Sequence, residues 1–273
     1  MSDIPLSAAP SAAQHWKRHS PLQSALRTGI TVVIVAAVVW SLRTIEIIPE
    51  FLYDAPAQTM DLFARMWPLD WAFFPTDIFP ALIETINIAA LGTVLAIVMA
   101  LPLSFLAARN VTRSPVARWI AQFLFVSSRS VNSLIWALLF VAIFGPGALA
   151  GVLSIAFRSI GFVGRLFGEA VEDAHPGPVE ALTAAGAGTM SVLVKGYWPQ
   201  VQPAFWSIVL LRWDINVRES AVLGLVGAGG IGVALDAAIS NLYWDQAGLV
   251  LLTIFGVVWI SEFVTSRVRA RII

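Results

Sequence analysis

Charge is concentrated in segment 212–220, within a stretch that is otherwise apolar enough to cross a membrane. The candidate residues for a site in this segment are Arg212, Asp214, Asn216, Arg218, Glu219 and Ser220. Each charge costs about 2.5–3.5 kcal/mol at the centre of a bilayer on insertion scales, so such residues face a protein interior or a watery path. Asp214 and Arg218 are spaced i, i+4 and can form an ion pair on a helix. The cluster therefore indicates an internal salt-bridge network, part of a translocation path, or both.

Two further polar clusters lie in apolar segments. Small hydroxyl residues around 127–133 surround Arg129 and Asn132, which are spaced i, i+3 and are predicted to share a helix face. Hydrogen bonds between helices would account for the asparagine and the serines, but less well for Arg129. Arg158 lies near the middle of the next apolar segment, and Arg165 is expected to extend toward the membrane surface. The excess of intramembrane charge is cationic, which suits an anionic substrate.

A Pro-Gly-Pro motif interrupts the chain at the start of segment 175–199. Glu180 is expected in the first turn of a new short helix, where its charge complements the helix dipole. Ala181 contributes to a face of small residues, and Gly186 ends the helix or permits close approach. An ordinary connecting helix would have the same features, so both interpretations stay open here.

Glycine is frequent in the segment that follows these charges. The candidate loop residues are Gly227, Gly229, Gly230 and Gly232. Three of them match the spacing G-x-G-x-x-G, but they follow a membrane segment rather than a strand of a βαβ unit, so a dinucleotide site is excluded. The run instead predicts non-helical backbone that lines a cavity at the outer end of a span. A short amphipathic helix over about 233–242 is expected after it.

Membrane-spanning helices must position all these residues, because the composition does not fit a soluble protein. The chain is 58% apolar and only 12% charged, with a mean hydropathy of +0.79, whereas soluble domains are about 45–50% apolar and about 25% charged. The sequence predicts an all-α polytopic membrane protein with six transmembrane helices. The expected spans cover about 28–42, 83–108, 117–144, 148–167, 201–223 and 247–268. Zero net charge argues against a nucleic-acid partner, and the absence of cysteine excludes disulfides and cysteine-bound metals.

The distribution of basic residues predicts the orientation. Arginine and lysine precede the first span, lie between spans two and three and between spans four and five, and follow the last span. Segment 43–80 is mainly acidic and aromatic. The positive-inside rule therefore puts both termini in the cytoplasm and segment 43–80 outside, as a helix at headgroup level or as a docking surface. The predicted parts are a cytoplasmic tail (1–27), a first span with an external segment (28–80) and a core (81–273).

The loop and the charged segment together resemble the permease subunits of ABC importers. The loop is similar to their Glu-Ala-Ala loop, with matching positions at Glu180, Ala181, Gly186 and Pro199. It departs from that pattern at Leu182 (usually Ala), Gly196 (usually Ile) and Trp198 (usually Leu). Segment 212–220 and the Gly run after it are similar to the C-terminal half of the phosphonate-type branch. The resemblance extends from about residue 81 to the end.

This resemblance implies a type I ABC importer permease fold in the bacterial inner membrane, with a coupling helix near 178–188. It implies a second permease copy, a cytoplasmic ATPase dimer that carries ATP and Mg²⁺, an external substrate-binding protein and surrounding membrane lipid. No cofactor is expected on this chain, and no phosphate-loop motif for ATP is present in the sequence. The substrate implied is a phosphonate or a related phosphorus oxyanion: phosphite, hypophosphite or phosphate.

Three other functions are compatible with parts of the sequence. An importer of another small solute such as methionine would carry a similar Gly run. A self-contained ion-coupled carrier could use Asp214 or Glu219 to relay protons. An intramembrane enzyme is disfavoured, because His15, His19 and His175 all lie outside the predicted spans. Whether two identical copies or two sister permeases pair is left open.

Overall fold

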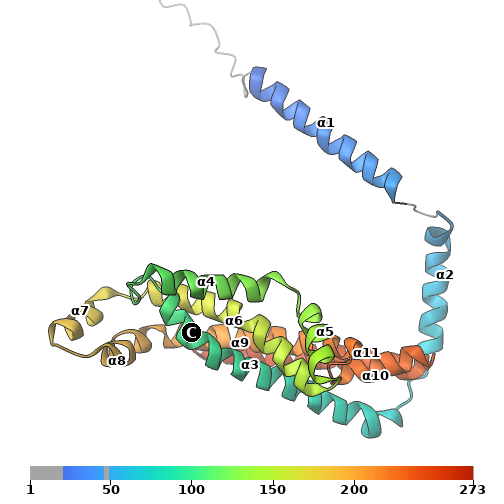
Figure 1. The fold of residues 1–273 in the computed structure, drawn as a ribbon. Coiled ribbons are helices and arrows are strands. Elements are labelled where there is room, and N and C mark those ends of the chain that lie inside the picture. Colours follow the sequence, from blue (N-terminus) through green and yellow to red (C-terminus); the bar gives the residue numbers. More distant parts are fainter. Residues whose placement is uncertain (1–20, 46–48, 273) are drawn as a thin grey trace, which may run out of the picture. The chain divides into compact units, whose positions relative to one another are not determined.

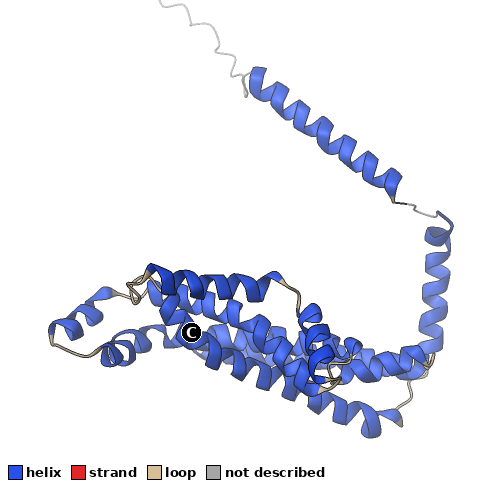
Figure 2. Ribbon diagram, viewed as in Figure 1, coloured by secondary structure: helices blue, strands red, loops and turns tan. Residues whose placement is uncertain are grey.

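The structure is a computed structural model that describes residues 21–45 and 49–272 (Figure 1). Within these ranges the regular elements are helices and no β-strand occurs, as Figure 2 shows. The all-α prediction is therefore confirmed for the described residues. The predicted tail falls largely outside them, as do His15 and His19. The chain divides into two compact units, residues 1–59 and 60–273, and each is described by itself.

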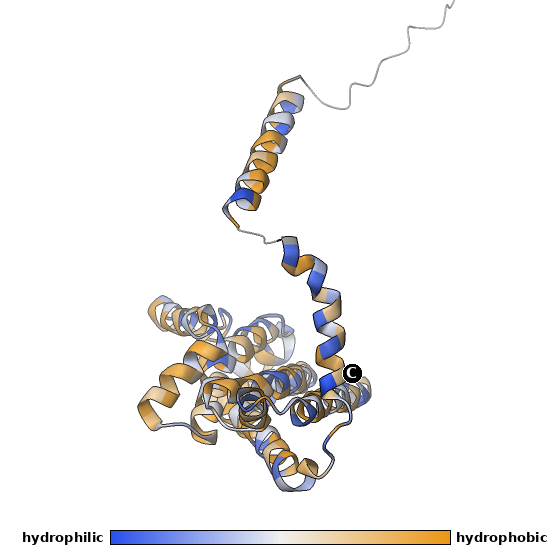
Figure 3. Ribbon diagram, turned by 90° about the vertical axis from the view of Figure 1, so that its right-hand side faces the viewer, coloured by the Kyte–Doolittle hydropathy of each residue, from blue (hydrophilic) through white to orange (hydrophobic). Residues whose placement is uncertain are grey.

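The first unit contains helix α1 (Pro21–Thr44) and the beginning of α2 (Pro49–Met66). The predicted first span lies within α1, whose segment Leu22–Thr44 has a mean hydropathy of 1.9 and no buried side chains. Figure 3 shows apolar residues around the middle of this helix and more polar residues toward its ends. A helix that is apolar all round is typical of a membrane span.

Helices α3 (Phe79–Ala107), α6 (Ala148–Glu172) and α9 (Trp198–Leu223) form the centre of the second unit (Figure 1). They approach closely because small residues lie where they meet. A Cβ added to Gly92 of α3 would lie 2.6 Å from Cγ2 of Ile155 on α6. The close packing buries polar side chains that a looser bundle would leave exposed.

The predicted third span is two helices and not one. Helix α4 (Pro115–Ser130) and helix α5 (Ser133–Phe144) meet at an angle of 91°. Val131 is extended (φ −108°, ψ 140°), and Asn132 caps α5 by accepting a hydrogen bond from the Leu134 N–H (3.1 Å). The expectation that Arg129 and Asn132 share a helix face is therefore wrong, because the helix ends between them.

The C-terminal part of the chain also contains a bent pair. After α9 come a 3₁₀ turn η3 (Gly224–Val226), the Gly run and helix α10 (Ile231–Ser240), with a bend of 40°. Helix α11 (Trp244–Ile272) completes the unit. Four described helices are long and apolar enough to cross a membrane, or six if each bent pair is one span. The prediction of a six-span helical membrane protein is confirmed in this form, and the placement of the termini stays a prediction.

Segment 60–80 joins α2 to α3 within the second unit. A π-helical turn η1 (Phe74–Ile78) leads directly into α3. Met66 and Leu69 lie against α11, where a Cβ added to Gly248 would be 3.1 Å from a side-chain atom of each. These contacts attach the end of α2 to the core, and its predicted position at headgroup level stays a prediction.

Candidate functional site

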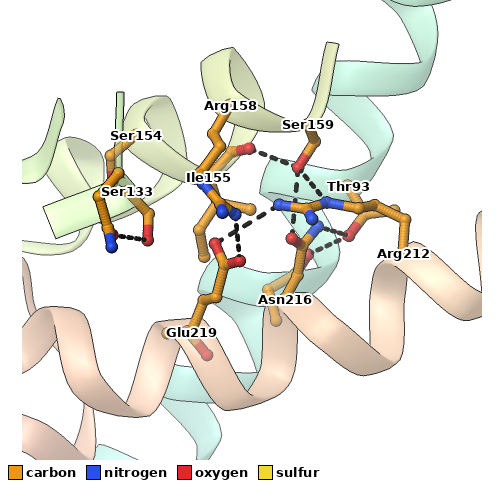
Figure 4. A network of polar contacts seen from close by, with 12 residues as sticks. Thr93, Ser133, Ser154, Ile155, Arg158, Ser159, Arg212, Asn216 and Glu219 are labelled. Carbon is orange, nitrogen blue, oxygen red and sulfur yellow. Dashed lines mark hydrogen bonds and ion pairs between the residues drawn. The ribbon is translucent and has the colours of Figure 1, made fainter. Parts of the chain in front are cut away.

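A buried polar network connects the three central helices (Figure 4). On α9, Arg212 is only 2% exposed and its Nε donates a hydrogen bond to Ser159 Oγ on α6 (2.8 Å). Asn216 is fully buried, and its Nδ2 donates to Thr93 Oγ1 on α3 (2.7 Å). Ser159 Oγ and Asn216 Oδ1 are 3.2 Å apart. Because buried polar groups are costly without partners, these bonds fix the register of the three helices.

Glu219 is the carboxylate of this network, and two guanidinium groups share it (Figure 4). Arg158 Nη1 lies 2.5 Å from Glu219 Oε1, and Arg212 Nη2 lies 3.4 Å from Oε2. The side chains of Arg158 and Glu219 are 29% and 17% exposed, and that of Arg212 is 3% exposed. The buried Nε of Arg158 has no hydrogen-bond partner among the residues that the structure describes. The network therefore carries a net positive charge, and its accessible edge is the Arg158–Glu219 pair.

The other two charges of α9 form a separate group that faces α11. Asp214 is 5% exposed and accepts hydrogen bonds from Arg218 Nη2 (2.6 Å) and Ser261 Oγ (2.8 Å). Arg218 Nη2 also lies 3.8 Å from Glu262 Oε2. The predicted i, i+4 pair of Asp214 and Arg218 is confirmed. The prediction of one network that contains all four charges is wrong, because the charges are divided between two faces of the helix. Ser220 is fully buried and donates to the Val217 carbonyl within α9.

Arg129 lies away from this network, at the exposed end of α4. It borders a cavity of about 640 Å³ between α4 and α6, together with Arg165 and Glu169. Arg165 is exposed and pairs with Glu169 at 2.9 Å, and its extension toward the membrane surface stays a prediction. The structure thus groups the predicted intramembrane residues in three places: the central network, the α11 side of α9 and the α4–α6 cavity.

The predicted coupling helix is α7 (Pro176–Ala184), which begins two residues earlier than expected. His175 caps it, because its Nδ1 accepts a hydrogen bond from the Gly177 N–H (3.1 Å). Glu180 consequently lies beyond the first turn, which contains no acidic residue, so its predicted place there is wrong. The carboxylate is exposed and has no ion pair among the described residues. Its charge is available to a partner protein.

Gly186 ends α7 as predicted. It has a φ of +78°, and the hydrogen bonds Gly186 N–H to Thr183 O (3.0 Å) and Ala187 N–H to Leu182 O (3.0 Å) form a Schellman motif. A residue with a Cβ is strained in this conformation. The glycine therefore determines how the chain leaves the exposed helix.

Gln200 connects α7 to α9 in a way that the sequence did not indicate. Its Oε1 accepts from the His175 N–H (2.9 Å), while its Nε2 donates to the carbonyls of Gly196 (2.7 Å) and His175 (3.3 Å). Pro199 lies beside it in the first turn of α9. Ala181 is exposed in the middle of α7. The short helix is thus attached to the long one at its capped end.

Two departures from the usual loop pattern compensate for each other. Gly196 is buried in the π-helical segment η2 (Val192–Tyr197), which follows the short turn α8 (Thr189–Ser191). A Cβ added to Gly196 would lie 3.3 Å from Leu182 Cδ1 and 3.4 Å from Val179 Cγ2 on α7. Leu182 therefore occupies the space that a larger side chain at position 196 would need.

This packing predicts that the double exchange is tolerated better than either single one. Gly196→Ile should cost about 1–3 kcal/mol of unfolding free energy through overpacking, and Leu182→Ala about 1–2 kcal/mol through lost apolar contact. The double variant should cost at least about 0.5 kcal/mol less than the sum, because the new isoleucine fills the vacated space. Unfolding of the solubilised protein measures all three. Strict additivity would contradict the contact.

Part of the Gly run forms the predicted non-helical loop, but the prediction is wrong for Gly232, because helix α10 begins at Ile231 and not near 233. Gly227, Gly229 and Gly230 have φ values of +80°, +82° and +77°, whereas Gly232 belongs to α10 and packs against Gly224. The loop borders a cavity of about 670 Å³ between α3 and α10. Thr85 of α3 holds it in place by accepting a hydrogen bond from the Ile231 N–H (2.7 Å). The loop thus lines a cavity as predicted, and its place at the outer end of a span stays a prediction.

Sequence reasoning missed the partners of these residues. Thr85, Thr93 and Ser159 were not singled out, although each is a buried hydroxyl in an apolar helix. A signal existed for the two threonines, because they are eight residues apart and so lie on one face of α3. Within the part of the chain that the structure describes, no group of three histidine or acidic side chains is placed to hold a metal ion.

The architecture is that of a transport permease. It combines a bundle of membrane-spanning helices, ion pairs inside that bundle and an exposed helix between two spans. Residues 92–270 match the family model described as binding-protein-dependent transport system inner membrane component. The chain therefore belongs to this family, and it is a multi-pass inner-membrane protein.

Relatives that are named for a transported substrate extend the comparison. The chain is 39% identical to the phosphite transport system permease protein PtxC of Stutzerimonas stutzeri, over 74% of this chain and 73% of that one. It is 35% identical to the phosphate-import permease protein PhnE of Mycolicibacterium smegmatis, over 94% of this chain but 48% of that one. The chain thus spans about half the length of the mycobacterial relative.

Solved structures share the fold. An inward-facing structure of the MetNI methionine ABC transporter superposes with a TM-score of 0.60, covering 72% of this chain and 96% of that one. The two sequences are 20% identical. At this identity the likeness establishes the ABC importer permease fold and nothing about the substrate.

Proposed function

We propose that the chain is the membrane-spanning permease subunit of an ATP-driven importer of a phosphorus oxyanion. Phosphonate, phosphite, hypophosphite and phosphate are the candidates. The observation that carries the proposal is the net positive charge of the central network, where Arg158 and Arg212 share the single carboxylate of Glu219. A guanidinium group binds oxyanions through paired N–H donors. Relatives named for phosphite and phosphate transport support the same class of substrate.

The Arg158–Glu219 edge of the network is proposed to line the translocation path. Both side chains are partly exposed although they belong to helices of the membrane-spanning core. A charged edge of this kind does not face hydrocarbon, since that placement costs several kcal/mol. It therefore faces water or protein. Asn216, Ser220 and Arg212 are buried behind this edge and would support the path rather than touch its contents in this conformation.

The proposed assembly contains two permease copies, a cytoplasmic ATPase dimer that binds ATP and Mg²⁺, and an external substrate-binding protein. Helix α7, with Glu180 exposed, would dock on the ATPase, and the Gly loop with its cavity would lie at the opposite, external side. This orientation puts both termini in the cytoplasm. It is supported by the arginines that follow α3 and that end α11, which the positive-inside rule assigns to the cytoplasmic face. ATP hydrolysis belongs to the partner, so the chain itself is proposed to be non-catalytic.

Uptake by the reconstituted assembly tests this proposal. The permease, assembled with its partner ATPase and binding protein, should accumulate phosphite, phosphate or methylphosphonate in proteoliposomes that contain ATP. An ATPase variant without hydrolytic activity should reduce uptake to background. Continued uptake with that variant would show an ion-coupled carrier instead. Accumulation of methionine in place of any phosphorus oxyanion would overturn the substrate class.

A further inference from the structure

A polar groove runs between α4 and α6, on the side of α6 away from the central network's buried core. Its volume is about 640 Å³. Its charged and amide side chains are Arg109, Gln122, Arg129, Arg165, Glu169 and Glu172. Glycines on α6 allow the close approach of α4, because a Cβ on Gly164 would overlap the ring of Phe125. The groove is thus a defined feature of how these two helices pack.

The deep end of the groove lies beside the middle of α6. Gly161 lies near the middle of α6, which has 25 residues. At 1.5 Å per residue this helix is about 37 Å long. A Cβ on Gly161 would lie 2.8 Å from Cγ of Arg129, so the stem of this arginine rests against the middle of a span. Arg129 is exposed and forms no ion pair among the described residues. An unpaired arginine at this depth does not face lipid, so the groove is filled with water or protein.

Charge changes along the groove. At the deep end Arg129 stands without a carboxylate, whereas toward the end that leads into α7 Arg165 is paired with Glu169 at 2.9 Å. At that same end Glu172 accepts the backbone N–H of Arg109 (2.7 Å). An anion is therefore attracted most strongly at the deep end and progressively less toward the other. Transport needs binding that is strong enough for entry and weak enough for release. The decrease in positive charge along the groove provides stronger binding at the deep end and weaker binding at the α7 end.

We propose that the α4–α6 groove is the exit half of the translocation path and that Arg129 receives the phosphorus oxyanion there. The inference rests on the proposed function for the identity of the anion. The guanidinium of Arg129 offers paired N–H donors to two oxygens of the ion, and the amide of Gln122 in the same groove offers another donor. Glu169 and Glu172 then favour release at the α7 end.

The absence of cysteine from the chain allows a direct test, because a single introduced thiol reports its own surroundings. Ser130→Cys and Val126→Cys place thiols in the groove, and Phe123→Cys places one on α4 outside it. Inside-out vesicles of the assembled transporter are treated with an anionic sulfonate thiosulfonate or a cationic ammonium thiosulfonate. Both groove thiols should react. At position 130 the anionic reagent should react at least fivefold faster than the cationic one, after each rate is divided by the rate of the same reagent with a free thiol. Arg129→Gln should remove that preference. Millimolar phosphite or inorganic phosphate should slow labelling in the groove but not at position 123.

Uptake with a saturating amount of binding protein provides the functional readout. Arg129→Gln should reduce phosphite uptake at least tenfold while ATP hydrolysis by the assembled complex persists, and Arg129→Lys should retain part of the uptake because it keeps the charge. Gly161→Ala should also reduce uptake, because a Cβ there would overlap the Phe125 carbonyl oxygen and Ser128 Oγ as well as the Arg129 stem, and so would push the end of α4 away from α6. The matched control is Gly256→Ala on α11, where nothing lies within 4 Å of an added Cβ. Arg113→Gln, an exposed arginine outside the groove, is the control for charge.

Three outcomes would overturn the inference. Groove thiols that react with neither water-soluble reagent would show that lipid or a second copy covers the groove. Protection by vesicles rich in anionic lipid, with none by phosphite or phosphate, would show a headgroup site instead of a path. Full uptake by Arg129→Gln would exclude the residue from transport. Each is distinct from failure of the proposed function, in which the unmodified transporter would accumulate no phosphorus oxyanion.

Discussion

Replacing Glu219 with glutamine is expected to lower the free energy of unfolding of the helical core by about 3–5 kcal/mol. The carboxylate is the counter-ion of both Arg158 and Arg212, at 2.5 and 3.4 Å. Its loss leaves two guanidinium groups without a carboxylate in a region where each unpaired charge costs several kcal/mol. Equilibrium unfolding in mixed detergent micelles, followed by circular dichroism, measures the change. Uptake should fall to background for the same reason.

Two variants test whether the loss of stability comes from removing the counter-ion that Arg158 and Arg212 share, or whether removing any carboxylate has the same effect. Glu262→Gln removes a 66% exposed carboxylate that lies 3.8 Å from Arg218, so it should change stability by less than about 0.5 kcal/mol. Adding Arg158→Gln to Glu219→Gln restores the original net charge of the network and should recover at least about 1 kcal/mol. If Glu219→Gln and Glu262→Gln are equally mild, the network does not hold the core together.

The division of the four charges of α9 into two groups could have been predicted from helical geometry. At about 100° per residue, positions 212, 216 and 219 lie within about 60° of one another, and positions 214 and 218 lie on the opposite side. Local spacing alone therefore separates the α3–α6 face from the α11 face. The i, i+4 pair of Asp214 and Arg218 was predicted for the same reason.

Contacts between distant segments could not be read in this way. Asn216 and Thr93 are 123 positions apart, and nothing in either local pattern selects the other. The end of α4 after Arg129 depends on an extended Val131 and on the cap that Asn132 gives to α5. An apolar run with a polar centre predicts one long span equally well, so the bend was missed. Both features arise from how the helices pack.

The start of the coupling helix illustrates a local error. The two prolines indicate a break in the chain, and the sequence predicts a helix that begins near 178. Proline is favoured at the first position of a helix, where its missing N–H is not needed, and His175 supplies the cap with its ring nitrogen. Histidine is not among the preferred capping residues, so little in the local pattern indicates that the helix starts at Pro176.

Replacing Gly186 with alanine is expected to reduce uptake at least tenfold, while Gly188→Ala leaves it unchanged. The two glycines share one loop, and neither has an atom within 4 Å of an added Cβ. They differ in backbone conformation, since φ is +78° at Gly186 and −65° at Gly188. Only the first disfavours a side chain, by about 1–2 kcal/mol. That strain opposes the Schellman motif and disturbs α7, which we propose contacts the ATPase. Uptake and ATP hydrolysis by both reconstituted variants measure the difference.

Glu180 determines how that result is interpreted. Its side chain is exposed and unpaired among the described residues, so Glu180→Gln should change stability by less than about 0.5 kcal/mol. If α7 docks on a partner, this silent change should still lower uptake about tenfold and weaken recovery of the ATPase with the permease. Loss of uptake in both Gly186→Ala and Glu180→Gln, one through backbone strain and one through charge, would follow from a docking role. Loss in Gly186→Ala alone would mean that the loop supports the membrane core and that the ATPase binds elsewhere.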